Sequence, residues 1–425
     1  MRPVPSKPDH DVAYLTDVEG SWQRLESFCA GNPLVQLTST GSGTTAVDVL
    51  RVREGATFVF GGDAIDRGPW SRRIVRTLLE ARNAQPDQVV LLAGNRDLNK
   101  LRLARELEGH PPQRAPDDVR LLPRAQLLKW IFAHTMGAAD AFEHRRCELL
   151  VERATTGAQD EDVAQSFVDD LAPAGDLACY LEACQLTWRA GSTLFVHGGV
   201  AKEALTIVPG AATIELSQFD DEVWRAHLDA FYAQQMAAFR ARAIEPDGRP
   251  AWESAILYQA PLKGRKLNPG SVVYGRMGDE LNNPALPSQA TIDALARCGI
   301  RRVMVGHTPS GDSPSIVRST SSPQPFEVIV ADNSRSRVQT GSKIVVRDDI
   351  VHIEARCVLD DDLGELDVKL ALALRDRATP IGQRTADGSL VKSEHGGEWL
   401  VFRYDAGWQC KQRLVGALGP LAEAR

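Results

Sequence analysis

Five short apolar runs, each ending in a polar cluster beside glycine, constrain this 425-residue chain more than any other feature of its sequence. The runs cover residues 13–15, 57–60, 89–92, 192–196 and 303–305, and the clusters after them read TDVEG, GGDAIDRG, AGNRD, HGG and GHTP. Short apolar runs bounded by glycine predict buried strands of a mixed α/β protein. Because active sites on open sheets lie beyond the ends of such strands, the polar clusters are the first place to look for function.

Between these strands the spacing of apolar residues changes to three and four, which is typical of helices. This spacing predicts helices within residues 121–154, 163–184 and 217–244. Strand-like runs and the turn signals Asp387-Gly388 and Gly396-Gly397 follow after residue 340. We therefore expect a catalytic domain over residues 1–340, with a helical insertion at about 98–190, and an accessory β-rich region over residues 341–425.

The composition excludes several classes of protein. Hydrophobic residues make up 43% of the chain, so a sizeable core can form, and no apolar run approaches the length of a membrane span. The net charge of −7 argues against general nucleic-acid binding. Seven scattered cysteines without a CxxC pair are typical of reduced thiols. Together with an N-terminus that has no long apolar segment, these features predict a cytoplasmic protein that does not bind membranes.

The residue types in the polar clusters are those that divalent cations prefer. Each cluster places a carboxylate, an amide or an imidazole beside a glycine at the end of a predicted strand. Alone, such an Asp or Asn is usually a turn residue, and a lone His is usually structural. Carboxylate oxygens and neutral imidazoles together suit Mn²⁺, Fe or Zn²⁺, and a shared Asp can bridge two ions. Taken together, the clusters predict a metal site.

The motifs GDxxDRG, GN-x-[DE], HGG and GHT occur in this order over about the first 340 residues. This set resembles the calcineurin-like metallophosphoesterase superfamily and, within it, the serine/threonine phosphatase-like phosphoprotein phosphatase branch. The resemblance implies a four-layer αββα sandwich. It also implies a hydrolase that cleaves a phosphoester by in-line attack of a hydroxide bridging two divalent ions, with Mn most expected and Mg, Fe or Zn as alternatives.

The resemblance further implies roles for individual residues. One ion would be held by Asp17, Glu19 and Asp63, and the other by Asp63, Asn95, His197 and His307. The residues expected to take part in catalysis are Asp66, Arg67 and Arg96. The substrate phosphate would be held by Arg67, Arg96 and Arg276. Asp332, after a further strand-like run, is as readily a loop residue as a neighbour of the site.

Two positions depart from the family pattern. The first motif of the family is Asp-x-His, and Glu19 stands here at the histidine position. Arg96 stands where the family has the histidine thought to protonate the leaving group. A guanidinium cannot exchange protons near neutral pH, so Arg96 is expected to bind phosphate instead.

The motifs leave the substrate open. A phosphomonoester, carried by a protein or by a small molecule, is the first expectation. The alternatives are pyrophosphate cleavage in a nucleotide such as a dinucleoside polyphosphate, and a non-catalytic module that only binds phosphate.

Overall fold

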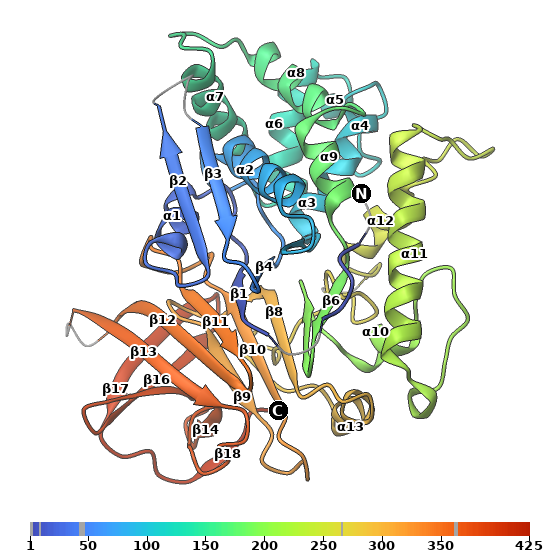
Figure 1. Ribbon diagram of the computed structural model, residues 1–425. Coiled ribbons are helices and arrows are strands. Elements are labelled where there is room, and N and C mark those ends of the chain that lie inside the picture. Colours follow the sequence, from blue (N-terminus) through green and yellow to red (C-terminus); the bar gives the residue numbers. More distant parts are fainter. Residues whose placement is uncertain (1–2, 8–9, 42–46, 265–266, 361–363) are drawn as a thin grey trace.

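The computed structural model describes residues 3–7, 10–41, 47–264, 267–360 and 364–425, and two sheets packed face to face form its centre (Figure 1). The first sheet contains, in spatial order, β13 (Glu365–Ala373), β12 (Ile350–Val358), β11 (Lys343–Arg347), β1 (Val12–Leu15), β4 (Thr57–Phe60) and β5 (Val89–Leu91). The second contains β6 (Thr187–Ala190), β7 (Thr193–Val196), β8 (Arg302–Pro309), β10 (Glu327–Asp332) and β9 (Ser315–Arg318).

The strands that carry the sequence motifs run parallel within each sheet. β1, β4 and β5 pair in parallel in the first sheet, as do β7, β8 and β10 in the second. Their side chains alternate between two cores: Tyr14 packs between the sheets with Phe195 and Met304, whereas Ala13 and Leu15 face the helices. Because both faces are buried, these strands read as continuous apolar runs in the sequence.

Helices cover the outer faces of the two sheets, which gives the predicted αββα order of layers (Figure 1). The α-helices are α1 (Trp22–Cys29), α2 (Ser71–Ala84), α3 (Asn95–Asn99), α4 (Leu103–Glu106), α5 (Asp117–Arg120), α6 (Arg124–Thr135), α7 (Ala141–Glu152), α8 (Asp160–Leu171), α9 (Asp176–Ala183), α10 (Lys202–Thr206), α11 (Asp221–Arg240), α12 (Glu253–Tyr258) and α13 (Gln289–Arg297). The three stretches predicted as helical contain α6 and α7, α8 and α9, and α11. Among the described residues, no helix has the length and hydrophobicity needed to cross a bilayer.

The region after residue 340 is divided between two sheets. β11 pairs with β1, and β12 and β13 extend the first sheet beyond it, so the expected boundary at residue 340 separates β1 from its partner strand. A third sheet contains β17 (Gln409–Val415), β16 (Glu398–Asp405), β15 (Leu390–His395), β14 (Gln383–Thr385) and β18 (Leu421–Glu423). By strand pairing, β11, β12 and β13 therefore belong to the same sheet as the motif-bearing strands β1, β4 and β5. A two-stranded sheet of β2 (Val35–Thr40) and β3 (Val47–Val52), absent from the sequence prediction, lies beside α1 and α2.

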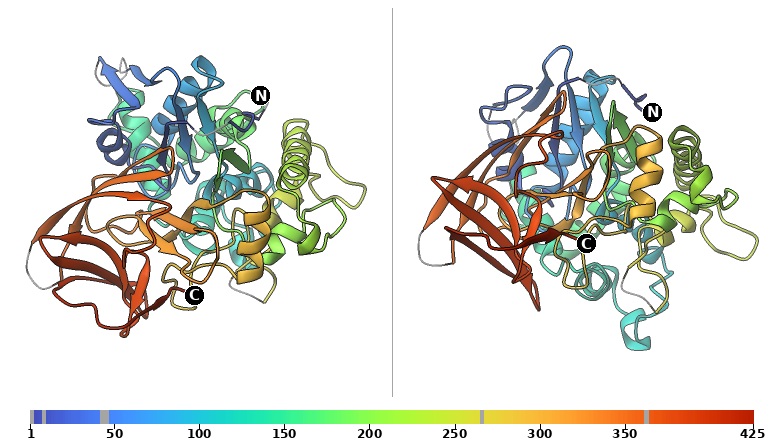
Figure 2. Two further views of the ribbon diagram at one scale, coloured as in Figure 1. Left: turned by 60° about the horizontal axis from the view of Figure 1, so that its bottom comes forward. Right: turned by 90° about the horizontal axis from the view of Figure 1, so that it is seen from below.

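Hydrogen bonds join the third sheet, whose strands are red in Figure 2, to the chain segment that follows β8. The Tyr404 hydroxyl accepts a hydrogen bond of 3.0 Å from the backbone N–H of Gly311. The buried ammonium of Lys392 donates to the carbonyl oxygens of Ser310 and Ser313, each at 2.6 Å. Since β8 carries His307, the third sheet supports one wall of the predicted site.

A buried ion pair joins the starts of β8 and β10. Arg302 and Glu327 are fully buried, with Nε of Arg302 2.6 Å from Oε1 of Glu327, and Nε of Arg318 lies 3.2 Å from Oε2. Glu327→Gln leaves buried guanidinium charge without its counter-ion, so the free energy of unfolding should fall by about 3–5 kcal/mol in urea denaturation. The control Glu365→Gln breaks a pair with Arg356 in which both side chains are about half exposed, and should cost less than about 1 kcal/mol. Equal losses in the two variants would contradict this reading.

Candidate active site

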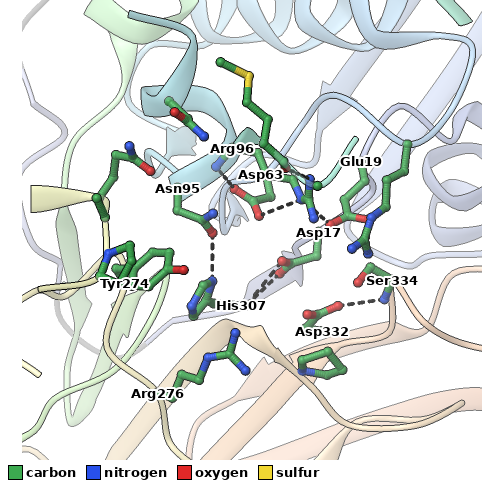
Figure 3. A pocket seen from close by; sticks show the side chains of 18 of the residues that line it. Asp17, Glu19, Asp63, Asn95, Arg96, Tyr274, Arg276, His307, Asp332 and Ser334 are labelled. Carbon is green, nitrogen blue, oxygen red and sulfur yellow. Dashed lines mark hydrogen bonds and ion pairs between the residues drawn. The ribbon is translucent and has the colours of Figure 1, made fainter. Parts of the chain in front are cut away.

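The polar clusters meet where the carboxyl ends of the parallel strands come together (Figure 3). The residues come from five strand ends: Asp17 and Glu19 after β1, Asp63 and Asp66 after β4, Asn95 and Arg96 in α3 after β5, His197 after β7, and His307 in β8. They surround or adjoin a cavity of about 490 Å³, which Arg67, Arg276 and Asp332 also line. The structure thus brings every predicted site residue to one place.

The backbone at the site is held in an uncommon conformation. Among the described residues, ten other than glycine have positive φ, and five of these are residues that the sequence predicted for the site: Asp17 (52°), Glu19 (47°), Asp63 (57°), Asp66 (111°) and His307 (58°). Such backbone conformations are costly for residues with a side chain and cluster at functional sites. The strand ends also approach closely, since a Cβ on Gly94 would collide with the backbone N of Asp63.

One group of donors converges around Asp63. Oδ1 of Asp63 lies 3.4 Å from Nε2 of His197, and Oδ1 of Asn95 lies 3.2 Å from that nitrogen and 2.7 Å from Nδ1 of His307. Nδ1 of His197 donates to the carbonyl oxygen of Gly61 at 2.7 Å, which directs Nε2 toward Asp63 and Asn95. Asp63, His197 and His307 thus bring possible ligand atoms together, and a cation between them would favour this orientation of the Asn95 amide, whose nitrogen would contact the same atoms if the group were turned over.

The electrostatics of the two histidines agree with this reading. Burial would lower the pKa of His197, but the Asp63 carboxylate raises it to about 10, so without a cation Nε2 carries a proton, which a bound metal ion would replace. Burial and the nearby Arg276 guanidinium hold the pKa of His307 well below its usual range. His307 is therefore neutral at neutral pH, the form of imidazole that ligates metals.

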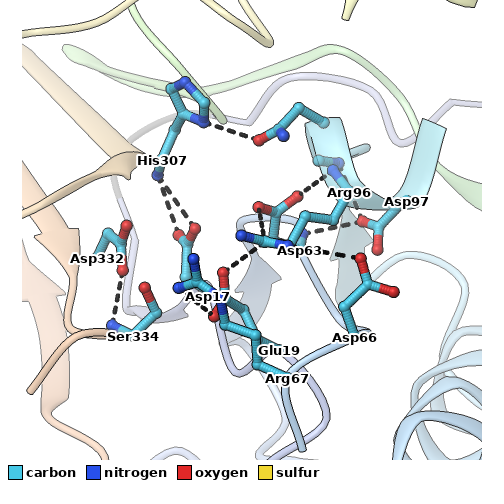
Figure 4. Close-up of polar contacts among 12 residues, drawn as sticks. Asp17, Glu19, Asp63, Asp66, Arg67, Arg96, Asp97, His307, Asp332 and Ser334 are labelled. Atoms are coloured by element: carbon cyan, nitrogen blue, oxygen red, sulfur yellow. Dashed lines mark hydrogen bonds and ion pairs between the residues drawn. The ribbon is translucent and has the colours of Figure 1, made fainter. Parts of the chain in front are cut away.

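A second group of carboxylates shares Asp63 and contains Asp17 and Glu19 (Figure 4). The Asp17 carboxylate accepts hydrogen bonds from the hydroxyl of Thr16 at 2.6 Å and from the backbone N–H of His307. Glu19 is engaged on both oxygens: Oε1 accepts from Nε of Arg96 at 2.6 Å and Oε2 from Nη1 of Arg67 at 3.0 Å. This group differs from the first because one of its carboxylates is already neutralised by guanidinium groups.

Arg96 lies among three carboxylates rather than free in the cavity. Besides its contact with Glu19, its Nε lies 3.7 Å from Oδ2 of Asp63 and its Nη1 3.5 Å from Oδ2 of Asp66. The fully buried ammonium of Lys100 donates to the same Asp66 oxygen at 2.8 Å. Asp66 thus holds two cations in place.

The structure adds two positioning residues that the sequence analysis did not assign. The buried Asp97 carboxylate accepts from the backbone N–H groups of Asp63, Ala64 and Gly94 at 2.9–3.0 Å and fixes the two strand ends relative to each other. Lys100 follows Arg96 by four residues, and helical i,i+4 spacing was the signal that could have linked it to the site.

The third sheet contributes an aromatic side chain to the cavity. Trp408, between β16 and β17, lines the cavity, and the guanidinium carbons of Arg276 and Arg335 lie 5.3 and 5.0 Å from its ring centroid. Within the described part of the chain, neither arginine has a carboxylate within 4.0 Å. These two cations are therefore available to an anion in the cavity. Nothing in the sequence around Trp408 indicates this role.

Comparison with solved structures finds phosphatases of low sequence identity. A cold-active protein-tyrosine phosphatase from a psychrophilic Shewanella species is 12% identical over 86% of this chain and 82% of its own, with a TM-score of 0.47. A protein serine/threonine phosphatase from Saccharomyces cerevisiae is 13% identical over 87% and 84% (TM-score 0.34), and a metallophosphoesterase from Sphaerobacter thermophilus is 12% identical over 85% and 88% (TM-score 0.28). None of the curated proteins matches the chain.

The family model for calcineurin-like phosphoesterases matches residues 41–311, more than half of the chain. This span includes Asp63, Asn95, His197 and His307, which form the first donor group described above. The resemblance to the calcineurin-like superfamily is confirmed, and the chain belongs to the calcineurin-like phosphoesterase family, whose members are metal-dependent hydrolases of phosphoesters.

Proposed function

We propose that the chain hydrolyses a phosphomonoester, carried by a protein or by a small molecule, with a divalent cation held beside Asp63. The observation that carries this proposal is the convergence of acceptor atoms from Asp63, Asn95 and two histidines, with arginines lining the same cavity. The two oxygens and two imidazole nitrogens of this set suit Mn²⁺, Fe or Zn²⁺, and we propose Mn²⁺. A cation bound there would supply Lewis acidity toward a phosphoryl oxygen and a nucleophilic water at neutral pH.

The protein's own groups bind and orient the substrate. Arg67 and Arg276 line the cavity and present planar donor groups that match phosphate oxygens. Gly61 holds the His197 ring through its carbonyl oxygen, and Asp97 holds the backbone that carries Asp63, so the donor set is fixed before substrate arrives. The cavity arginines favour a phosphorylated partner, and the net charge of −7 disfavours anionic membranes and nucleic acid in general.

The first experiment is a metal-dependent assay. Chelator-treated protein is reconstituted separately with Mn²⁺, Mg²⁺, Fe²⁺, Co²⁺ and Zn²⁺ and assayed with p-nitrophenyl phosphate. We expect turnover that requires added metal and is greatest with Mn²⁺. Phosphate binding without turnover under every metal would contradict hydrolysis and identify a binding module instead.

A nucleotide pyrophosphohydrolase is the second candidate, because the guanidinium groups of Arg276 and Arg335 line the cavity without a carboxylate within 4.0 Å in the described structure and could hold a second phosphate. A panel of phosphopeptides, sugar phosphates and dinucleoside polyphosphates separates the two functions by kcat/KM. We expect phosphotyrosine peptides, which are aryl monoesters, to be better substrates than the dinucleoside polyphosphates. Preferential cleavage of anhydrides, with little turnover of monoesters, would favour the second candidate.

Trp408→Ala tests whether the third sheet takes part in substrate binding. Cation–π contacts with two guanidinium groups are worth about 0.5–2 kcal/mol each, so KM should rise several-fold while kcat changes little. Trp399→Ala, on the neighbouring strand β16 and outside the cavity lining, is the control and should leave KM unchanged. Equal KM values for the Trp408 variant and the wild type would remove Trp408 from the site.

A further inference from the structure

We propose that the guanidinium of Arg96 takes the place of the second cation, so that the chain holds one divalent ion instead of the two implied by the family pattern. This inference rests on the proposed function, since it concerns the same site. It starts from the contact between the two residues that depart from the pattern. Glu19 and Arg96 are 77 positions apart in the sequence, yet they form a 2.6 Å ion pair in which the side chains are only 6% and 12% exposed.

The second carboxylate group already has positive charge supplied by the protein. Both oxygens of Glu19 accept from guanidinium groups, one from Arg96 and one from Arg67. A divalent ion bound by Glu19 would have to share an oxygen with one of these guanidinium groups or displace it. It would also lie close to the Arg96 guanidinium in a buried setting, where repulsion between like charges is only weakly screened.

The Asp63 carboxylate lies between the first donor group and the Arg96 guanidinium. Oδ1 lies 3.4 Å from Nε2 of His197 and also accepts the backbone N–H of Arg96 at 2.8 Å, and Oδ2 lies 3.2 Å from the Asn95 amide. Oδ2 lies 3.7 Å from the side-chain Nε of Arg96. Asp63 therefore contacts both the residues that would hold a metal ion and the Arg96 guanidinium, as expected if Arg96 replaces one ion.

Arg96 is held in this position by contacts that do not depend on a substrate. Nη1 lies 3.5 Å from Oδ2 of Asp66, an oxygen that also accepts from the buried Lys100. The backbone at Glu19 and Asp66 has positive φ, so the carboxylates on both sides of the guanidinium come from constrained turns. The Asp63–Asn95–His197–His307 group has no arginine side chain hydrogen-bonded to its proposed ligand atoms in the described structure.

The test counts bound ions, independently of turnover. Protein loaded with excess Mn²⁺ and then desalted is measured by elemental analysis, and the stoichiometry is checked by calorimetric titration. We expect one ion per wild-type chain and none in His197→Ala. We expect a second ion in Arg96→Met, which removes the guanidinium, and in the double variant Glu19→His/Arg96→His, which restores both histidines of the family pattern. Arg120→Met, at an exposed position on α5, is the matched control and should hold one ion.

The outcomes separate this inference from the proposed function. Two ions in the wild type would overturn the replacement by Arg96 and leave a metal-dependent phosphoesterase intact. No ion in the wild type would overturn both proposals. If Arg96→Met and the double variant both stay at one ion, the guanidinium is not what excludes the second, and the inference is wrong. Retention of the ion by His197→Ala would place it in the other carboxylate group and would also overturn the inference.

Discussion

Asp63→Asn is expected to lose its bound metal ion and to lower kcat by about 10³-fold or more. Asp63 is the only residue shared by the two candidate ligand groups of the described structure. Replacing one carboxylate oxygen by an amide nitrogen removes the negative charge that attracts a cation, while the size of the side chain stays the same. Lewis-acid stabilisation of a phosphoryl transition state is worth several kcal/mol, and each 1.36 kcal/mol is a factor of ten in rate.

Elemental analysis and turnover of p-nitrophenyl phosphate, measured on the same preparation, check this prediction. Circular dichroism shows whether the variant is folded, which is expected because asparagine can keep the acceptor for the Arg96 backbone N–H. Asp118→Asn changes an exposed carboxylate on α5 and serves as the control, with wild-type metal content and rate. A folded Asp63→Asn protein that retains its ion and a near-normal kcat would show that the metal site has been assigned to the wrong residues.

The position of the site could be predicted because its residues lie directly at strand ends. Asp17, Asp63 and His197 each follow an apolar run by one to three residues, so the strand that carries the residue also places it. Parallel pairing then gathers these ends at one edge of each sheet. The sequence therefore contains both the ligand type and its location.

The partners of the site residues could not be predicted in the same way. The departures at Glu19 and Arg96 are visible in the sequence as two separate substitutions, but their ion pair depends on how β1 and β5 are ordered in the sheet. The contact between Trp408 and Arg276 likewise depends on how the third sheet docks against the segment after β8. Such contacts join residues far apart in the chain, and neither spacing nor local pattern encodes them.

The placement of β11 shows the same limit for the fold. Its alternation of apolar residues predicts a strand, which the structure contains, but alternation does not specify a partner strand. Because β11 lies far from the predicted site motifs in the sequence, the sequence pattern assigns it to an accessory region. In the structure it pairs with β1, more than 300 residues earlier. A strand at the edge of a predicted domain can complete a sheet that begins at the other end of the chain.

The second large effect is expected in the choice of leaving group. Release of an alkoxide, as from phosphoserine, needs a proton as the P–O bond breaks, whereas a phenolate or a phosphate leaves with less help. The enzyme should therefore prefer aryl esters, including phosphotyrosine, or anhydrides over alkyl esters. General-acid assistance is worth about 10²–10⁴-fold, and the preference should be of this order.

The surroundings of Arg96 support this expectation. Burial lowers the pKa of the Arg96 guanidinium, but Glu19 and Asp66 raise it above its already high ordinary value, so it cannot give up a proton near neutral pH. His307, the one histidine among the described residues that line the cavity, has a pKa held well below its usual range by burial and by Arg276. It therefore carries no proton to donate as an imidazolium.

The slope of log kcat/KM against the pKa of the leaving group measures this dependence. A series of aryl and alkyl phosphates should give a steep negative slope for the wild type, because negative charge develops on an oxygen that no acid protonates. In Arg96→His the slope should become shallower, with alkyl esters gaining more than aryl esters, since an imidazolium can protonate the leaving oxygen. Arg67→His, which introduces a histidine at the neighbouring cavity arginine, is the control and should change kcat/KM by a similar factor across the series. A shallow wild-type slope that the Arg96 variant does not alter would mean that another group supplies the proton and that Arg96 serves only to bind charge.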